Sequence, residues 1–210
     1  MITTLDGGVG DDNFQIGQVF GADPNVAGTD VNGFYPSGVA VGDEIDTTQI
    51  TRGFLSNGIS VPLVAYGAEG DDTFTVFSNT ASLRLEGEGG DDSFLIRAFV
   101  SEDEAIVNGG GGDDFFEYNI NAPVSINGGA GNDRVVAVGT EADDTFVITD
   151  EGIFGAGVNI QVDGVEEAIE VDGLEGDDTF FVLSTRPGVV NTLIGGLGSD
   201  TVNVLSLIHI

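Results

Sequence analysis

Residues 67–95 read GAEGDDTFTVFSNTASLRLEGEGGDDSFL and contain one nine-residue pattern twice, beginning at Gly67 and at Gly87. The pattern has glycine at positions one and four, aspartate at position six and an apolar residue at position eight. Glycine and aspartate are turn-forming residues, and alternation after position six is typical of a short strand with one buried face. The pattern therefore predicts a bend and a strand, with the aspartate pointing outwards and the position-eight residue inwards.

The same pattern occurs eight times without gaps. Position one is always glycine, at Gly7, Gly67, Gly87, Gly109, Gly128, Gly139, Gly173 and Gly195. Position six is always aspartate, at Asp12, Asp72, Asp92, Asp114, Asp133, Asp144, Asp178 and Asp200. Position eight is always apolar, at Phe14, Phe74, Phe94, Phe116, Val135, Phe146, Phe180 and Val202. We expect the glycines at positions one and four to adopt positive φ, so that the chain turns tightly and carbonyl oxygens converge.

The position-six aspartates recur at intervals that suit one coil of a parallel β-helix. The steps from Asp72 through Asp92 and Asp114 to Asp133, and from Asp178 to Asp200, are each roughly 20 residues long. Each coil would contain the bend and strand of the pattern, a far bend and a return strand. We expect return strands at 82–85, 105–107, 124–126 and 192–194, and far bends at 78–80, 101–103 and 121–123. The apolar residues of position eight would then fill the interior.

Coils stacked about 4.7–4.9 Å apart would place the aspartates in columns. Two carboxylates at that distance repel by roughly 3–4 kcal/mol at an effective dielectric constant near 20. Calcium binds oxygen ligands at about 2.3–2.6 Å, so one ion can bridge carboxylates of adjacent coils and also take bend carbonyls, whereas the stiff octahedron of magnesium fits less well. The alternative is plain turns with solvated acids. The candidate metal ligands are Gly7, Asp12, Gly67, Asp72, Gly87, Asp92, Gly109, Asp114, Gly128, Asp133, Asp144, Gly173, Asp178, Gly195 and Asp200.

The bend at Gly139 departs from the pattern. It has Thr140 and Ala142 at positions two and four, and Asp144 follows Asp133 after only about half of the usual step. We expect this bend on the opposite side of the helix, and as a weaker calcium site, because alanine tolerates positive φ poorly.

The eight motifs resemble the RTX, or hemolysin-type, calcium-binding repeat G-G-x-G-x-D-x-U-x. Together with the strands between them, the motifs organise most of the chain outside 17–60. The resemblance implies a right-handed parallel β-helix or β-roll that holds several calcium ions. It also implies type I secretion, disorder in the calcium-poor cytoplasm and folding outside the cell. Such arrays occur in toxins, proteases, lipases and adhesins, and the long, interrupted coils of this chain look most like an adhesin.

The composition excludes several kinds of site. The chain has 36 acidic and five basic residues, a net charge of −31, no cysteine and one histidine, His209, and its bases are all arginine. These counts exclude disulfides, Cys/His zinc sites, thiol nucleophiles and lysine Schiff bases. They also argue against binding to nucleic acid or to anionic membranes, and no apolar run is long enough to span a bilayer. With 40% hydrophobic residues the chain should fold, but it needs cations to compact.

We expect one repeat domain over residues 1–204, with two irregular stretches. Residues 17–60 are either an insertion or degenerate coils, and the step from Asp12 to Asp72 equals three usual steps, which favours degenerate coils. Residues 149–170 are expected to form a hairpin on the side of the stack. Residues 205–210 (LSLIHI) resemble a translated sequencing adapter and are set aside as an artefact, the alternative being a genuine last strand.

These features predict a calcium-binding structural module of a secreted or cell-surface bacterial protein of adhesin or toxin type. One alternative is a carbohydrate- or protein-binding module, with an extracellular glycan or protein partner held by calcium or by residues 17–60. Another is a polysaccharide-active β-helix enzyme, but acids are too abundant here for a carboxylate pair to be informative. The chain also lacks lysine and a credible catalytic histidine, so we do not expect an enzyme.

Overall fold

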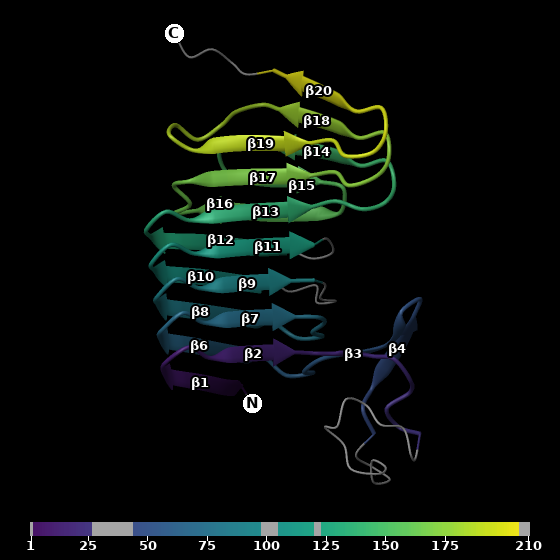
Figure 1. Ribbon diagram of the computed structural model, residues 1–210, viewed down its shortest axis with the longest axis vertical. Coiled ribbons are helices and arrows are strands. Elements are labelled where there is room, and N and C mark those ends of the chain that lie inside the picture. The colour runs from purple at the N-terminus through teal and green to yellow at the C-terminus, as the bar shows by residue number, and fades with distance from the viewer. Residues whose placement is uncertain (1, 27–43, 98–104, 120–122, 206–210) are drawn as a thin grey trace.

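The computed structural model describes residues 2–26, 44–97, 105–119 and 123–205 (Figure 1). These residues form strands, bends and loops and no helix, so none of them forms a helix suited to crossing a membrane. The far bend expected at 101–103, most of the one expected at 121–123, and residues 206–210 lie outside the described part.

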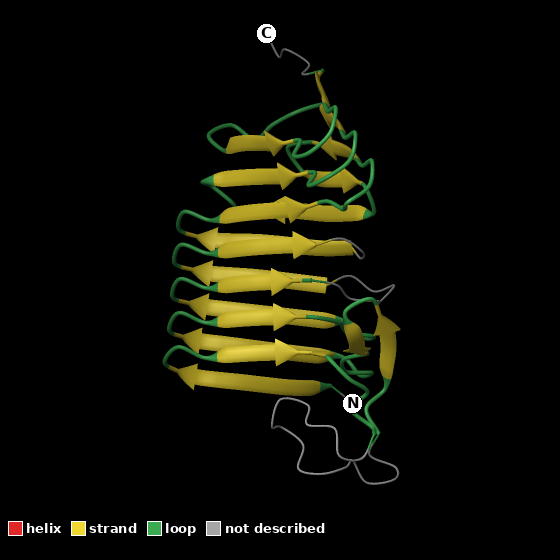
Figure 2. Cartoon of the chain, turned by 45° about the vertical axis from the view of Figure 1, so that its right-hand side comes forward, coloured by secondary structure: helices red, strands yellow, loops and turns green. Residues whose placement is uncertain are grey.

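Two large sheets, built mostly of parallel strands, account for most of the described chain (Figures 1 and 2). The ten-stranded sheet has the order β1 (Thr3–Val9), β6 (Leu63–Glu69), β8 (Leu83–Gly89), β10 (Ala105–Gly111), β12 (Pro123–Ala130), β16 (Val158–Asp163), β15 (Gly152–Gly155), β14 (Thr145–Ile148), β18 (Thr179–Val182) and β20 (Thr201–Val204). The seven-stranded sheet has the order β19 (Val190–Ile194), β17 (Ala168–Asp172), β13 (Arg134–Val138), β11 (Phe115–Asn119), β9 (Ser93–Ile96), β7 (Thr73–Val76) and β2 (Asn13–Ile16). The fold is therefore all-β, as the sequence predicts.

From β6 to β13 the chain alternates strictly between the two sheets. We call one strand of the ten-stranded sheet, the bend after it and the following strand of the seven-stranded sheet a layer. The strands of neighbouring layers pair in parallel, as between β8 and β10 and between β9 and β11. The predicted return strands lie within β8, β10, β12 and β19 and are confirmed. Regular layers arise because the motif sets one bend and one strand at nearly constant intervals.

The core lies between the two sheets and is built from alternate residues of each strand. Phe14, Phe74, Phe94 and Phe116 stack with ring centroids 4.7, 4.8 and 4.9 Å apart. Leu85, Val107 and Ile126, from the opposite sheet, are also buried. The predicted interior column is thus confirmed, and its spacing is that of neighbouring hydrogen-bonded strands.

The described residues of the stretch 17–60 leave the layers between the first and second motif. β1 pairs directly with β6, and β2 pairs directly with β7. The strands described in this stretch form a separate antiparallel sheet of three, β3 (Val19–Phe20), β5 (Gly53–Ser56) and β4 (Thr47–Ile50), which projects from the stack (Figure 1). The described part of the stretch is therefore an insertion and not a set of degenerate coils, because direct pairing leaves no place for another layer.

An antiparallel meander interrupts the alternation after β13. β14 pairs antiparallel with β15, β15 pairs antiparallel with β16, and β16 pairs in parallel with β12. The predicted hairpin is present, but it lies within the ten-stranded sheet and not on its side. The meander also changes the path of the later motifs. The first five bends lead from the ten-stranded to the seven-stranded sheet, whereas the bends at Gly139, Gly173 and Gly195 lead back, at the opposite edge (Figure 1).

Candidate metal centre

The aspartates of the first five motifs form one column along the first edge. The backbone N–H of Asp12 donates to Oδ1 of Asp72 at 2.7 Å. The same bond continues from Asp72 to Asp92 at 2.8 Å, from Asp92 to Asp114 at 2.8 Å and from Asp114 to Asp133 at 2.9 Å. We call these five residues the first column. The predicted alignment of Asp72, Asp92, Asp114 and Asp133 is confirmed, and Asp12 joins them.

The last three motifs form a second column at the opposite edge. The N–H of Asp144 donates to Oδ1 of Asp178 at 2.8 Å, and the N–H of Asp178 donates to Oδ1 of Asp200 at 3.0 Å. Asp144 therefore lies opposite the first column, as the short step after Asp133 predicts. Asp178 and Asp200 share its edge because the chain reaches them through the same reversed path.

The prediction that these aspartates point outwards is wrong for all of them except those at the column ends, Asp12, which is half-buried, and Asp200, which is exposed. Asp72, Asp92 and Asp114 are 1% exposed, and Asp133 and Asp178 are fully buried. Position six lies two residues before position eight, so the period-two alternation puts both side chains on the inner face, as the alternate burial of residues 72–76 shows. Its side chain turns under the bend to accept the N–H of the neighbouring layer.

The aspartates at position five form a second ladder, which sequence reasoning missed. The N–H of Asp71 donates to Oδ1 of Asp11 at 3.1 Å, that of Asp91 to Asp71 at 2.9 Å, and that of Asp113 to Asp91 at 2.8 Å. These side chains accept from the following layer, whereas those at position six accept from the preceding layer. The sequence signal that could have indicated this ladder is the aspartate found at position five in six of the eight motifs.

The glycines of position one have a different role from the one predicted. None of them has a φ in the left-handed region; positive φ instead occurs at positions two and four, as at Gly110 (117°) and Gly112 (140°). A Cβ on Gly109 would overlap Oδ2 of Asp114 and the carbonyl oxygen of Gly128. Position one is therefore glycine because the buried carboxylate and a neighbouring carbonyl occupy the space of a side chain.

Each buried aspartate retains one oxygen without a protein partner. The Oδ2 atoms concerned are those of Asp72, Asp92, Asp114, Asp133 and Asp178. A buried oxygen without a partner destabilises the folded protein, more so when it is charged. Asp144 differs, because its Oδ2 accepts hydrogen bonds from the N–H of Thr140 at 2.7 Å and from the hydroxyl of Thr140 at 2.9 Å.

Burial raises the pKa of these carboxyl groups. The pKa of Asp92 is raised to about 6 and that of Asp114 to about 7, mainly by desolvation. The backbone hydrogen bond acts in the opposite direction, and neighbouring aspartates raise the pKa further. Desolvation also raises the pKa of Asp72, Asp133 and Asp178. Desolvation therefore favours a proton on these carboxyl groups or a cation beside them.

The chemistry of the bends suits a hard cation. Carboxylate and backbone carbonyl oxygens are the ligands that calcium prefers. In the part of the chain that the structure describes, no three His, Cys, Asp or Glu side chains form a group that could hold a metal. An ion here would therefore have to combine aspartate Oδ2 atoms with carbonyl oxygens of the bends.

Comparison of the chain with protein-family models, with curated proteins and with solved structures finds no match.

Proposed function

We propose that this chain is a calcium-stabilised structural module with the architecture of a right-handed parallel β-helix or β-roll of the RTX type. The observation that carries the proposal is the set of five buried Oδ2 atoms without a partner, four in the first column and one in the second. Carboxylates without a partner favour unfolding unless a positive charge neutralises them. Calcium supplies that charge and accepts several oxygen ligands at once.

The path of the chain supports the proposed architecture. Strands alternate between two facing sheets, and each layer pairs in parallel with the next. The bends have identical length and their hydrogen bonds repeat from layer to layer, which places equivalent oxygens in register. A calcium-binding array requires this repetition, because each ion would draw on two adjacent layers.

In this proposal the ligands come from aspartate side chains and glycine carbonyls of neighbouring layers. Asp92 Oδ2 and the carbonyl oxygen of Gly109 both lie beside Gly87, and Asp114 Oδ2 and the carbonyl oxygen of Gly128 both lie beside Gly109. The same pairing recurs at Asp72 in the first column and at Asp178 in the second. We leave Asp144 out of the ligand set, because Thr140 already satisfies its Oδ2.

The charge supports a place outside the cell. A net charge of −31 should keep the chain expanded wherever divalent cations are scarce. Weak calcium sites of extracellular modules bind at roughly 10⁻⁴ to 10⁻³ M, so folding would follow export. We therefore propose a secreted or cell-surface parent of adhesin or toxin type, with type I secretion, and we assign no catalytic step to this chain.

A calcium titration tests the proposal. Far-ultraviolet circular dichroism in EDTA should show a largely disordered chain, and calcium at millimolar concentration should convert it to a β-rich spectrum. EDTA added afterwards should reverse the change, and magnesium at the same concentration should be much less effective. A full β spectrum in EDTA that calcium does not alter, with an unchanged melting temperature, would overturn the proposal.

A further inference from the structure

A groove of about 700 Å³ lies on the outer face of the ten-stranded sheet, and none of its lining residues is a column aspartate. Its volume falls within the range of small-ligand sites. It opens where β10, β12 and β16 run side by side next to the meander. The buried residues of these strands, such as Val124 and Ile160, point into the core, so their neighbours form the floor of the groove.

The floor is a flat array of polar side chains in register. Ser125 lies opposite Gln161, and Asn127 lies between Asn108 and Asp163 on the adjacent strands. Asn127 and Gln161 are exposed, and within the described part of the chain their amide groups are not hydrogen-bonded to other side chains. An amide both donates and accepts hydrogen bonds. Such an array suits a ligand whose polar groups also both donate and accept hydrogen bonds.

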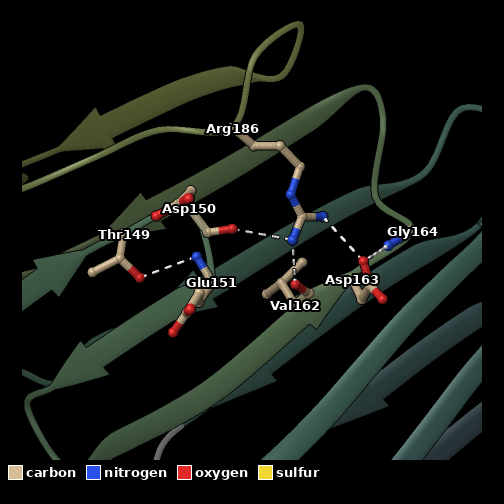
Figure 3. A network of polar contacts seen from close by, with 7 residues as sticks. All are labelled: Thr149, Asp150, Glu151, Val162, Asp163, Gly164 and Arg186. Carbon is tan, nitrogen blue, oxygen red and sulfur yellow. Dashed lines mark hydrogen bonds and ion pairs between the residues drawn. The ribbon is translucent and has the colours of Figure 1, made fainter. Parts of the chain in front are cut away.

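One wall of the groove is held by Arg186, from the loop between β18 and β19 (Figure 3). Its Nη2 donates to the carbonyl oxygen of Val162 at 2.5 Å and to that of Asp150 at 3.1 Å, and its Nη1 lies 3.9 Å from Oδ1 of Asp163. The hydroxyl of Ser184 also donates to Asp150 at 2.6 Å. The wall is therefore fixed by several polar contacts and does not depend on a ligand for its shape.

Phe154, which is half-buried, also lines the groove from β15, the strand that pairs with β16. The exposed part of an aromatic ring offers an apolar surface for a flat ligand. An apolar ring next to amide and hydroxyl groups matches a sugar, which has C–H groups on its faces and hydroxyl groups at its edges. The groove is thus lined both by polar amide and hydroxyl groups and by an apolar aromatic ring.

Charge limits the class of ligand. Asp150, Glu151 and Asp163 line the groove against the single positive charge of Arg186. This negative excess, on a chain of net charge −31, disfavours acidic sugars and other anions. Two of the three acids already have partners in Ser184 and Arg186, which leaves the uncharged amides as the main groups available. A cationic peptide would instead need several carboxylates without partners, and among the described lining residues only Glu151 offers one.

We propose that this groove binds a neutral oligosaccharide. The amides of Asn127 and Gln161 hydrogen-bond its hydroxyl groups, Phe154 packs against a sugar face, and Arg186 holds the wall in place. No floor residue is among the proposed calcium ligands, so a failure of sugar binding in the folded, calcium-loaded chain would leave the proposed function standing.

The test measures binding of the whole chain, in calcium, to immobilised neutral oligosaccharides of hexoses and N-acetylhexosamines. Uronic-acid and sialylated oligosaccharides and a lysine-rich peptide serve as comparison probes. We expect at least one neutral probe to bind, and Asn127→Ala combined with Gln161→Ala to weaken that binding roughly tenfold or more. Thr75→Ala, on the outer face of the seven-stranded sheet, is the matched control and should leave binding unchanged.

Circular dichroism and melting temperature establish that each variant is folded. Failure of every neutral probe to bind would overturn the proposal. So would tighter binding of the acidic probes or of the peptide, or equal affinity of the double variant and the control.

Discussion

The bends that begin at Gly109 and at Gly139 share the spacing of glycine and aspartate, but they differ in backbone conformation at positions two and four and satisfy their aspartates differently. Asp114 is buried and its Oδ2 has no partner, whereas Oδ2 of Asp144 accepts two hydrogen bonds from Thr140. The residue at position two makes the difference. Gly110 lies within β10 at a φ of 117° and has no side chain, whereas Thr140 lies outside the strands and offers both N–H and hydroxyl. A bend can therefore supply hydrogen-bond donors to both oxygens of its carboxylate. In the glycine-rich bends one oxygen has no such donor and needs a proton or a cation.

The largest expected effect is a loss of stability when a side chain is introduced beside Asp114. In Gly109→Ala the new Cβ would overlap a carboxylate and a backbone carbonyl that are both held by the neighbouring layer. We expect destabilisation by more than about 4 kcal/mol, the exceptional range for one substitution. The matched control is Gly111→Ala in the same bend, where the nearest atom lies 3.9 Å from the added Cβ and φ is not positive.

Urea unfolding in calcium measures both variants. The control should stay within about 0.5 kcal/mol of the parent chain. Equal destabilisation of the two variants would show that position one needs glycine for a reason other than the carboxylate.

A smaller effect is expected from pH in the absence of calcium. The raised pKa values of Asp92 (about 6) and Asp114 (about 7) mean that the folded state binds more protons than the unfolded state above about pH 4. Stability in EDTA should therefore fall as pH rises from 5 to 8, by roughly 3 kcal/mol. Calcium should flatten this dependence, because the cation replaces the proton.

Far-ultraviolet circular dichroism at several pH values gives the comparison in EDTA, where the β-rich fraction should be largest near pH 5 and fall towards pH 8, and urea unfolding gives it in calcium. A stability in EDTA that increases over this range would contradict the assigned burial of the two carboxyl groups.

The smallest expected effect comes from removing the negative charge of the aspartate in each of the two bends. Asp114→Asn replaces a carboxylate that lacks a partner by a neutral amide, so at pH 8 it should stabilise the chain in EDTA by roughly 2 kcal/mol and weaken its response to calcium. Asp144→Asn should alter the calcium midpoint little, because Oδ2 of Asp144 already has protein partners. Calcium titrations followed by circular dichroism measure both. Identical shifts of the midpoint would remove the distinction between the bends.

Sequence reasoning identified the repeated unit more completely than its surroundings. The motif alone placed the bends, the strands after them and the stacked phenylalanines, since Gly, Asp and Phe act over a short length of local chain. It also placed Asp144 opposite the first column from the short step after Asp133. It misjudged the side-chain direction of Asp92 and Asp114, because residues two apart in a strand share a face and each aspartate therefore points inwards with the phenylalanine two positions later.

The insertion between Asp12 and Asp72 was harder to predict. The long step between these two aspartates is compatible both with three coils and with a loop that returns to the same place, and only the pairing of β1 with β6 distinguishes them. The hydrogen-bonded ladder of the position-five aspartates could not be predicted either, because aspartate is common in turns for local reasons alone.

The sequence by itself determined that the chain forms short layers with an aspartate at each bend, because residue type and spacing act locally. The tertiary structure alone decided which bends share an edge and which carboxylate oxygens lack a partner. It also decided where the meander and Arg186 form a groove. Those outcomes depend on which strands pair across long stretches of chain, as Asp12 does with Asp72, and local sequence does not specify that choice.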